Sequence, residues 1–330
     1  MLTQKIAHIT ISDFFTESGV YYPNLKLSYQ LAGSDDADAP IVLVNHALTG
    51  NSEVTGENGW WNSLIGEGKC IDTNHFKILS FDIPGNGYLP ESGLIEHYKD
   101  FVARDVAKIF LRGLENLQID SLFAAIGGSL GGGIVWEMGA LEPNLIQNLI
   151  PIASDWKSTD WLIGNCFLQE RILENSNNPI EDARIHAMLC YRTPFSLKVK
   201  FQRTRHKEKE IFNTESWLAH HGKKLQQRYQ LAAYKLMNQL LKTIDISRGR
   251  GTLETVASKI TGNIHIISIN SDLFFSPDED LETYRRLKRL KENVYHDEIQ
   301  SIHGHDAFLI EYGQLSLLLR NIFQVQKSSI

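Results

Sequence analysis

Residues 124–133 read Ala-Ala-Ile-Gly-Gly-Ser-Leu-Gly-Gly-Gly, and this stretch decides the fold. The apolar run that leads into it is typical of a buried strand, and the spacing of apolar residues over 130–141 predicts a helix. A serine between glycines at such a turn is the layout of a nucleophile elbow, G-x-S-x-G. Glycines are needed because the sharp, strained turn leaves no room for Cβ atoms. The stretch therefore predicts Ser129 as a nucleophile, although a glycine-rich connection without chemistry would also fit so short a motif.

Two later segments favour the catalytic interpretation. Residues 264–272 form a β-branched run that ends in Asp272, as expected of a buried parallel strand that leads into a loop. A loop at 301–309 carries two histidines and opens an apolar helix. Taken singly, such an aspartate can be a helix cap and such a histidine merely exposed. The chain order Ser, Asp, His is that of the catalytic triad in α/β hydrolases, in which an acid fixes the tautomer of the base.

Strand and helix patterns alternate along much of the chain. Buried strands are predicted at 41–44, 77–82, 121–126 and 145–153. Helical spacing of apolar residues covers 101–117, and polar–apolar alternation before residue 40 predicts antiparallel edge strands. Strands that alternate with helices imply a mostly parallel sheet flanked by helices. We therefore expect the α/β class and the α/β-hydrolase fold.

The pattern changes from about residue 155 to about residue 258, where it is mostly helical. This segment is too long for one crossover connection. We therefore expect an α/β-hydrolase core formed by 1–154 and 259–330, with a helical cap (lid) inserted at 155–258. Such a cap can bury the active site and select the substrate, or it can be an appendage or a dimer surface.

The composition excludes several classes of function. The 330 residues are 42% hydrophobic and 22% charged, as in ordinary globular proteins, and the net charge of -6 indicates neither a nucleic-acid nor a membrane partner. The three cysteines are widely separated and show no metal-ligand spacing, so we expect reduced thiols and no metal. No signal-peptide pattern and no bilayer-spanning run is present, which predicts a cytoplasmic protein.

Several segments carry a family resemblance. Residues 46–50 read HALTG, 59–61 read GWW, 183–192 contain AR…YR, and 304–309 read GHDAFL. With these motifs the chain resembles the homoserine O-acetyltransferase family, acyltransferases with an α/β-hydrolase fold, over most of its length. The GWW and GHDAFL pieces are far more specific than the G-x-S-x-G motif.

The resemblance implies roles for individual residues. Carried over by position, it implies that Ser129 is the nucleophile, Asp272 the orienting acid and His305 the base, rather than the histidine two residues earlier. The backbone N–H groups of Leu48 and Leu130 would form the oxyanion hole.

An acceptor site is also implied by the resemblance, through Arg184, Tyr191 and Asp306. Homoserine is a zwitterion with a hydroxyl group. Arg184 can bind its carboxylate bidentately, Tyr191 can add a hydrogen bond, and Asp306 can pair with its ammonium group.

The activity implied by the resemblance is transfer of an acetyl group from acetyl-CoA to homoserine through an acyl-serine intermediate, in methionine biosynthesis. No cofactor would be bound, and the protein would be a homodimer. The sequence departs from the family pattern in that 82–88 resembles ordinary α/β hydrolases, 161–183 is shorter, and Leu130 replaces a methionine. A serine hydrolase (esterase or thioesterase), or an O-acyltransferase that uses serine or succinyl-CoA, therefore stays open.

Overall fold

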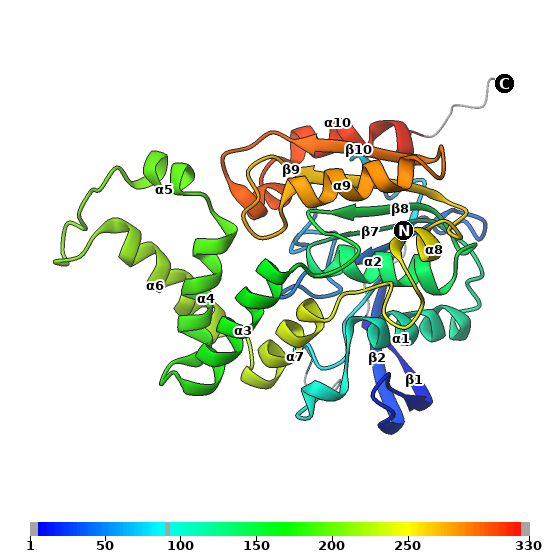
Figure 1. Cartoon of the computed structure of the whole chain (residues 1–330), viewed down its shortest axis with the longest axis horizontal. Helices are drawn as coiled ribbons and strands as arrows, with labels where there is room; N and C mark the ends of the chain where they lie inside the picture. Colours follow the sequence, from blue (N-terminus) through cyan, green and yellow to red (C-terminus); the bar gives the residue numbers. More distant parts are fainter. Residues whose placement is uncertain (1–5, 90–92, 325–330) are drawn as a thin grey trace.

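A computed structural model describes residues 6–89 and 93–324 of the chain. Its centre is an eight-stranded sheet of strand order β1-β2-β6-β3-β7-β8-β9-β10 (Figure 1). The strands are β1 (Ile6–Phe15), β2 (Tyr21–Gly33), β3 (Ile41–Asn45), β6 (Lys77–Phe81), β7 (Leu122–Gly128), β8 (Ile146–Ile152), β9 (Asn263–Ile269) and β10 (Val294–Ile299). Strands β1 and β2 are antiparallel to their neighbours, and the six others are parallel. A separate pair, β4 (Ile65–Gly66) and β5 (Ile71–Asp72), lies in the connection after β3.

Helices cover both faces of the sheet. One face packs against α1 (Ala103–Asn116), α2 (Leu130–Leu141), α8 (Leu253–Ala257) and α9 (Pro277–Lys288), and the other against α10 (Tyr312–Phe323). Strand β3 shows why two cores form: Leu43 belongs to the first and Val44 to the second, because successive side chains of a strand point to opposite faces. This arrangement confirms the predicted fold class.

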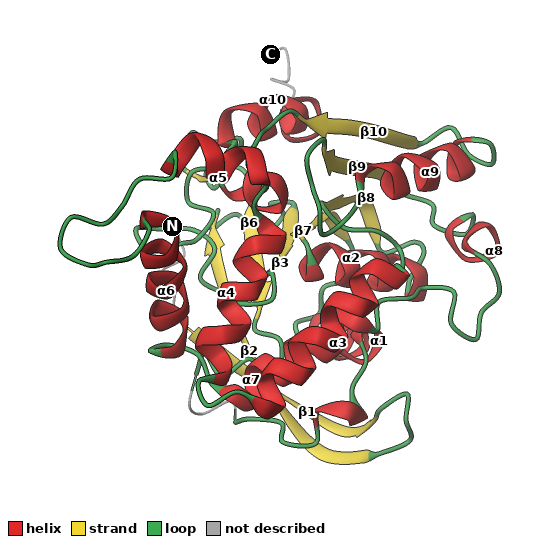
Figure 2. Ribbon diagram, turned by 60° about the vertical axis from the view of Figure 1, so that its left-hand side comes forward, coloured by secondary structure: helices red, strands yellow, loops and turns green. Residues whose placement is uncertain are grey.

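Six helices lie between β8 and β9 in the sequence, and the first five of them extend beyond one end of the strands (Figures 1 and 2). These five are α3 (Asp160–Asn175), α4 (Pro179–Tyr191), α5 (Pro194–Phe201), α6 (Asn213–Gln226) and α7 (Leu231–Lys242). Helix α4 packs against α6 and α3, and α3 packs against α7. The division into a core and a cap at 155–258 stays a prediction, and its outer limits at residues 1 and 330 lie outside the described residues.

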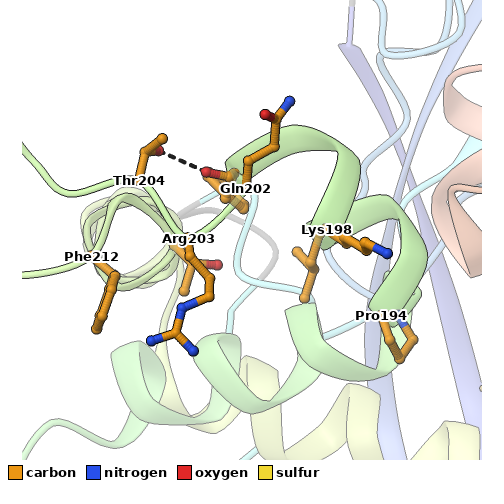
Figure 3. A pocket seen from close by; sticks show the side chains of 9 residues that line it. Pro194, Lys198, Gln202, Arg203, Thr204 and Phe212 are labelled. Atoms are coloured by element: carbon orange, nitrogen blue, oxygen red, sulfur yellow. Dashed lines mark hydrogen bonds between the residues drawn. The ribbon is translucent and has the colours of Figure 1, made fainter.

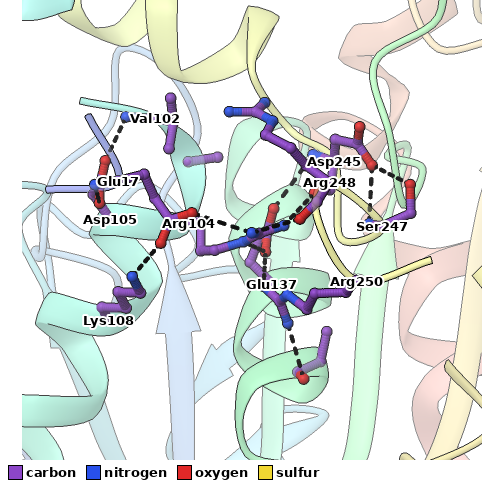
Figure 4. Close-up of polar contacts among 12 residues, drawn as sticks. Glu17, Val102, Arg104, Asp105, Lys108, Glu137, Asp245, Ser247, Arg248 and Arg250 are labelled. Atoms are coloured by element: carbon purple, nitrogen blue, oxygen red, sulfur yellow. Dashed lines mark hydrogen bonds and ion pairs between the residues drawn. The ribbon is translucent and has the colours of Figure 1, made fainter. Parts of the chain in front are cut away.

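A buried ionic cluster holds residues 245–250, which connect α7 to the next part of the core, against α1 and α2 (Figure 4). Glu137 on α2 is 1% exposed, and one of its carboxylate oxygens lies 3.1 Å from Arg104 Nε and 3.1 Å from Arg250 Nη2. Arg104 also donates to the Asp245 carbonyl at 2.9 Å and to the Arg248 carbonyl at 2.8 Å. The cluster joins α1, α2 and residues 245–250. We call Arg104, Glu137 and Arg250, with the carbonyl groups of Asp245 and Arg248, the Glu137 cluster.

Candidate active site

Ser129 lies at the turn between β7 and α2 with φ 57° and ψ -126°, a strained conformation for a residue with a Cβ. The neighbouring glycines explain how the turn fits. A Cβ on Gly131 would lie 2.3 Å from the carbonyl oxygen of Asn45, and one on Gly127 would lie 2.5 Å from the backbone of Gly131. The absence of side chains therefore lets α2 approach β3 and β7 closely, as the sequence pattern predicts.

Three of the predicted residues meet beyond the carboxyl ends of parallel strands. His305 Nε2 lies 2.9 Å from Ser129 Oγ, and His305 Nδ1 lies 2.7 Å from Asp272 Oδ2. The other oxygen of Asp272 accepts hydrogen bonds from the backbone N–H groups of Phe274, at 2.7 Å, and Phe275, at 3.0 Å. All three side chains belong to buried residues. This geometry can pass a proton from the hydroxyl to the imidazole and stabilise the resulting positive charge.

Aromatic rings surround the imidazole of His305, which belongs to a short 3-10 helix, Gly304–Leu309, rather than to a loop. The ring centroids of Phe274, Phe275, Phe308 and Tyr191 lie 5.2, 5.6, 5.7 and 5.4 Å from the centroid of the His305 ring. These rings exclude water from the base. The other histidine of this segment, His303, is not part of the triad: its ring hydrogen-bonds the Ser196 hydroxyl on α5 at 3.0 Å.

The two backbone groups predicted for the oxyanion hole flank the elbow. Leu130 is the first residue of α2, so its N–H has no acceptor within the helix. Leu48 lies in a tight turn closed by a hydrogen bond from Gly50 N–H to the Ala47 carbonyl at 2.9 Å. The Tyr229 hydroxyl donates to the Leu48 carbonyl at 2.7 Å and so holds the peptide group that follows Leu48. Their function as oxyanion donors stays a prediction.

The loop at 82–88, which departs from the family pattern, holds this turn in place. The buried Asp82 carboxylate accepts hydrogen bonds from Ser52 N–H (2.8 Å), Ser52 Oγ (3.0 Å) and Asn86 Nδ2 (3.1 Å). His46 Nε2 accepts from Ile83 N–H at 3.0 Å. Burial lowers the pKa of His46, so the ring stays neutral and keeps an acceptor nitrogen for that bond. The loop thus has a structural role beside the site.

The three predicted acceptor residues gather on one side of His305. The Arg184 guanidinium lies 5.7 Å from the centroid of the Tyr191 ring, which packs on His305. Asp306 follows His305, and burial raises the pKa of its carboxyl while Arg184 and Arg192 oppose this shift. Arg192 Nε lies 3.7 Å from Asp306 Oδ2. The structure brings these residues together, and their binding of an acceptor stays a prediction.

Sequence reasoning missed residues that contact the site from the helical segment. Arg192 carried no role in the sequence analysis, although it lies inside the AR…YR segment. Arg228 donates to the Thr49 carbonyl at 3.2 Å, 179 positions away along the chain. No sequence signal links Arg228 or Tyr229 to the turn at 46–50, because the contact depends on how helices α6 and α7 pack over it.

Within residues 6–89 and 93–324 there is no group of three or more histidine, cysteine or acidic side chains that could hold a metal ion. No helix in this part of the chain combines the length and apolar character needed to cross a membrane.

Comparisons with known proteins identify the fold and the relatives of this chain. Residues 40–172 match the family model described as alpha/beta hydrolase fold. The homoserine O-acetyltransferase of Corynebacterium diphtheriae is 31% identical, with 98% of this chain and 96% of that protein covered. The enzyme of that name from Cyclobacterium marinum is 30% identical, with 93% and 92% covered.

Solved structures resemble the chain over nearly its full length. The homoserine O-acetyltransferase of Bacillus anthracis superposes with a TM-score of 0.86 at 18% identity, covering 100% of both chains. Esterase E22 superposes with a TM-score of 0.87 at 18% identity, covering 98% of this chain and 100% of that one. At this identity the likeness concerns the fold alone, which confirms the predicted α/β-hydrolase fold.

Proposed function

The chain belongs to the homoserine O-acetyltransferase family, and from this premise we propose that it transfers an acetyl group from acetyl-CoA to the hydroxyl of homoserine. The observation that carries the proposal is the hydrogen-bonded series Ser129–His305–Asp272 in a chain that belongs to this family. The product is O-acetylhomoserine, an intermediate of methionine biosynthesis.

The first half-reaction forms an acyl-enzyme. His305 Nε2 takes the proton of Ser129 Oγ as that oxygen attacks the thioester carbonyl carbon. Negative charge gathers on the carbonyl oxygen, where the N–H groups of Leu48 and Leu130 stabilise it; loss of one such donor costs about 10²–10³ in rate. The C–S bond breaks, the departing thiolate takes the proton from His305, and acetyl-Ser129 remains.

The second half-reaction transfers the acetyl group to the acceptor. Arg184 binds the carboxylate of homoserine and Asp306 pairs with its ammonium group. His305 removes the proton of the acceptor hydroxyl, which attacks the acetyl carbonyl, and the proton returns to Ser129 Oγ. The rings of Phe274 and Phe308, together with the helices α3 to α7 beyond the ends of the strands, keep water away from the ester.

A hydrolase with the same triad is the second candidate, and the loop at 82–88 is the observation that favours it. Its contacts with Ser52 and His46 give that loop a supporting role that does not require hydrolysis. The two activities differ in the molecule that attacks the acyl-enzyme: water in an esterase, and the acceptor hydroxyl in a transferase. The acyl donor and acceptor are therefore the quantities to measure.

Product analysis separates these activities. The protein is incubated with acetyl-CoA or succinyl-CoA and with homoserine, serine or no acceptor, and products are identified by mass spectrometry. We expect O-acetylhomoserine to dominate and hydrolysis without acceptor to be slow. Acetate release at one rate with and without homoserine would identify a hydrolase. Ser129→Ala is the control, since it removes the attacking oxygen and should yield no acetylated protein.

The proposed enzyme is a cytoplasmic homodimer in which the helical segment takes part. Exposed apolar side chains on α3 and α5 support the formation of a dimer, among them Trp161 (60% exposed), Phe167 (58%) and Phe195 (56%). Beside α5 lies a hollow of about 810 Å³ with a mainly apolar lining, which includes Pro194 and Phe212 (Figure 3). Light scattering on the purified protein measures the number of subunits, and a monomer would contradict the proposal.

A further inference from the structure

Positive charge is in excess at the mouth of the site, between α4 and α6. The cations there are Arg184, Arg192, Lys224 and Arg228. Burial, followed by the positive charges of Arg184 and its neighbours, lowers the pKa of His221 in their midst to about 4. Within the described residues, Arg192 is the one of the four that forms an ion pair, with Asp306. The group therefore carries several positive charges against one carboxylate.

Arg192 shows that this excess is not balanced within the protein. Its side chain is 11% exposed, and Nε and Nη1 are buried without a hydrogen-bond partner. A buried guanidinium with unpaired N–H groups is costly, and an anion that reaches it recovers that cost. The carboxylate of a zwitterionic acceptor can meet one of these cations, but the acceptor's ammonium group restores the excess. The positive field that remains attracts the acyl donor, which carries a diphosphate and a 3′-phosphate, to the neighbouring surface.

Helix α5 provides a path outward from the triad. Its first turn is fixed beside the His305 segment, because the Thr193 hydroxyl donates to the Ile302 carbonyl at 2.6 Å and Ser196 pairs with the ring of His303 at 3.0 Å. Lys200 lies one turn further on the same face as Ser196. At 1.5 Å per residue, the distance from Thr193 to Lys200 along the helix is about 10 Å.

A hollow of about 450 Å³ opens at that end of α5, between α5 and α6. Lys200, Phe201, Trp217 and His220 line it. The Lys200 ammonium lies 5.5 Å from the centroid of the Trp217 ring and 5.7 Å from that of Phe201, contacts that hold the charge in place. The guanidinium of Arg192 lies 5.9 Å from the centroid of the same Trp217 ring, so this residue links the hollow to the mouth of the site.

We infer that this hollow binds the phosphates of the acyl donor, through Lys200 and His220, while the pantetheine arm runs along α5 past Arg192 to Ser129. The inference rests on the proposed function, because it assigns a place to the nucleotide end of acetyl-CoA. It makes the cap helices part of the donor site rather than only a cover over the acceptor.

The test compares two thioesters that differ only in the nucleotide: acetyl-CoA and S-acetylpantetheine. Lys200→Ala should raise KM for acetyl-CoA about tenfold, since a charge-assisted hydrogen bond is worth about a decade in affinity. KM for S-acetylpantetheine should change less than twofold, as should kcat with either donor. The matched control is Lys198→Ala, on the same helix but facing the hollow of Figure 3.

Calorimetry with desulfo-CoA gives a second readout that needs no turnover. We expect Lys200→Ala to weaken its binding about tenfold and Lys198→Ala to leave it unchanged. Equal effects of the two variants, equal effects on both thioesters, or no effect of Lys200→Ala would overturn the donor subsite while the transferase activity stands. A wild-type protein that neither binds desulfo-CoA nor uses acetyl-CoA would overturn the proposed function together with the subsite.

Discussion

Two groups of arginines in this protein differ in how their charges are satisfied. In the Glu137 cluster, Arg104 uses Nε for the carboxylate and both terminal nitrogens for acceptors on other segments (Figure 4). At the mouth of the site, Arg192 has two buried nitrogens without a hydrogen-bond partner, and its one ion pair, with Asp306, is 3.7 Å long. The first arrangement joins parts of the fold, and the second leaves binding capacity for a ligand.

Burial of a charged side chain therefore does not by itself indicate the role of that side chain. Removal of one member of a paired cluster destabilises the fold because it leaves the charges of the other members without compensation. An unpaired cluster repels itself and is relieved when an anion binds. Stability and substrate affinity should therefore respond in opposite ways to substitutions in the two groups.

Substitution within the Glu137 cluster should have the largest effect. Glu137→Ala removes the carboxylate shared by the buried Arg104 and the half-buried Arg250, and we expect the free energy of unfolding to fall by about 3 kcal/mol. Urea unfolding measures it. The control is Glu254→Ala, which breaks the surface pair with Arg286 and should cost less than about 1 kcal/mol. Similar losses in the two variants would contradict the distinction between the groups.

Arg184→Ala tests the acceptor side of the mouth. We expect KM for homoserine to rise about a hundredfold, because a bidentate charge-assisted contact is lost, while KM for acetyl-CoA changes little. Steady-state kinetics with each substrate varied in turn measures both. A larger rise for acetyl-CoA than for homoserine would remove the carboxylate role from Arg184.

Arg192→Met tests the difference between the two groups, since it removes one charge from the group at the mouth and retains most of the side-chain volume. We expect Tm to fall less than in Glu137→Ala, because the lost contact with Asp306 is 3.7 Å long and Arg184 remains near that carboxylate. KM for homoserine should rise about tenfold because Asp306 loses its partner. A fall in Tm comparable to that of Glu137→Ala would show that Arg192 also serves the fold.

The smallest expected effect concerns pH. The pKa of His221 is lowered from 6.5 to about 4 in the folded protein, so the unfolded chain binds more protons between these values. Stability should therefore rise with pH across this window and fall on acidification. His221→Gln should flatten the dependence of Tm on pH between 4 and 6.5 by a few degrees. An unchanged slope would argue against crowding of positive charge at the mouth.

The sequence predicts the centre of the site better than its surroundings. Ser129, Asp272 and His305 follow the carboxyl ends of β7, β9 and β10, and parallel strands bring such ends together. The order of residues along the chain therefore specifies a meeting point. The positions of β7 and β9 followed from apolar runs because these two strands are largely buried on both faces.

The contacts made by helices α3 to α7 could not be predicted from the sequence pattern. Lys200 and Trp217 meet only because α5 and α6 pack with a particular rotation, which apolar spacing does not define. The same holds for Arg192, whose neighbour Tyr191 carried the family signal. The function of the loop at 82–88 was also hidden, because its partners Ser52 and His46 lie on another connection.

The hydrogen bond from the Tyr229 hydroxyl to the Leu48 carbonyl has a mechanical consequence. It connects the segment between α6 and α7 to Leu48, the residue whose N–H is predicted to stabilise the charge that develops during acyl transfer. A change in the position of those helices would therefore also displace Leu48 and weaken its contact with the reacting carbonyl. The phenol of Tyr229 would in this way link the position of the helices to the rate of acyl transfer.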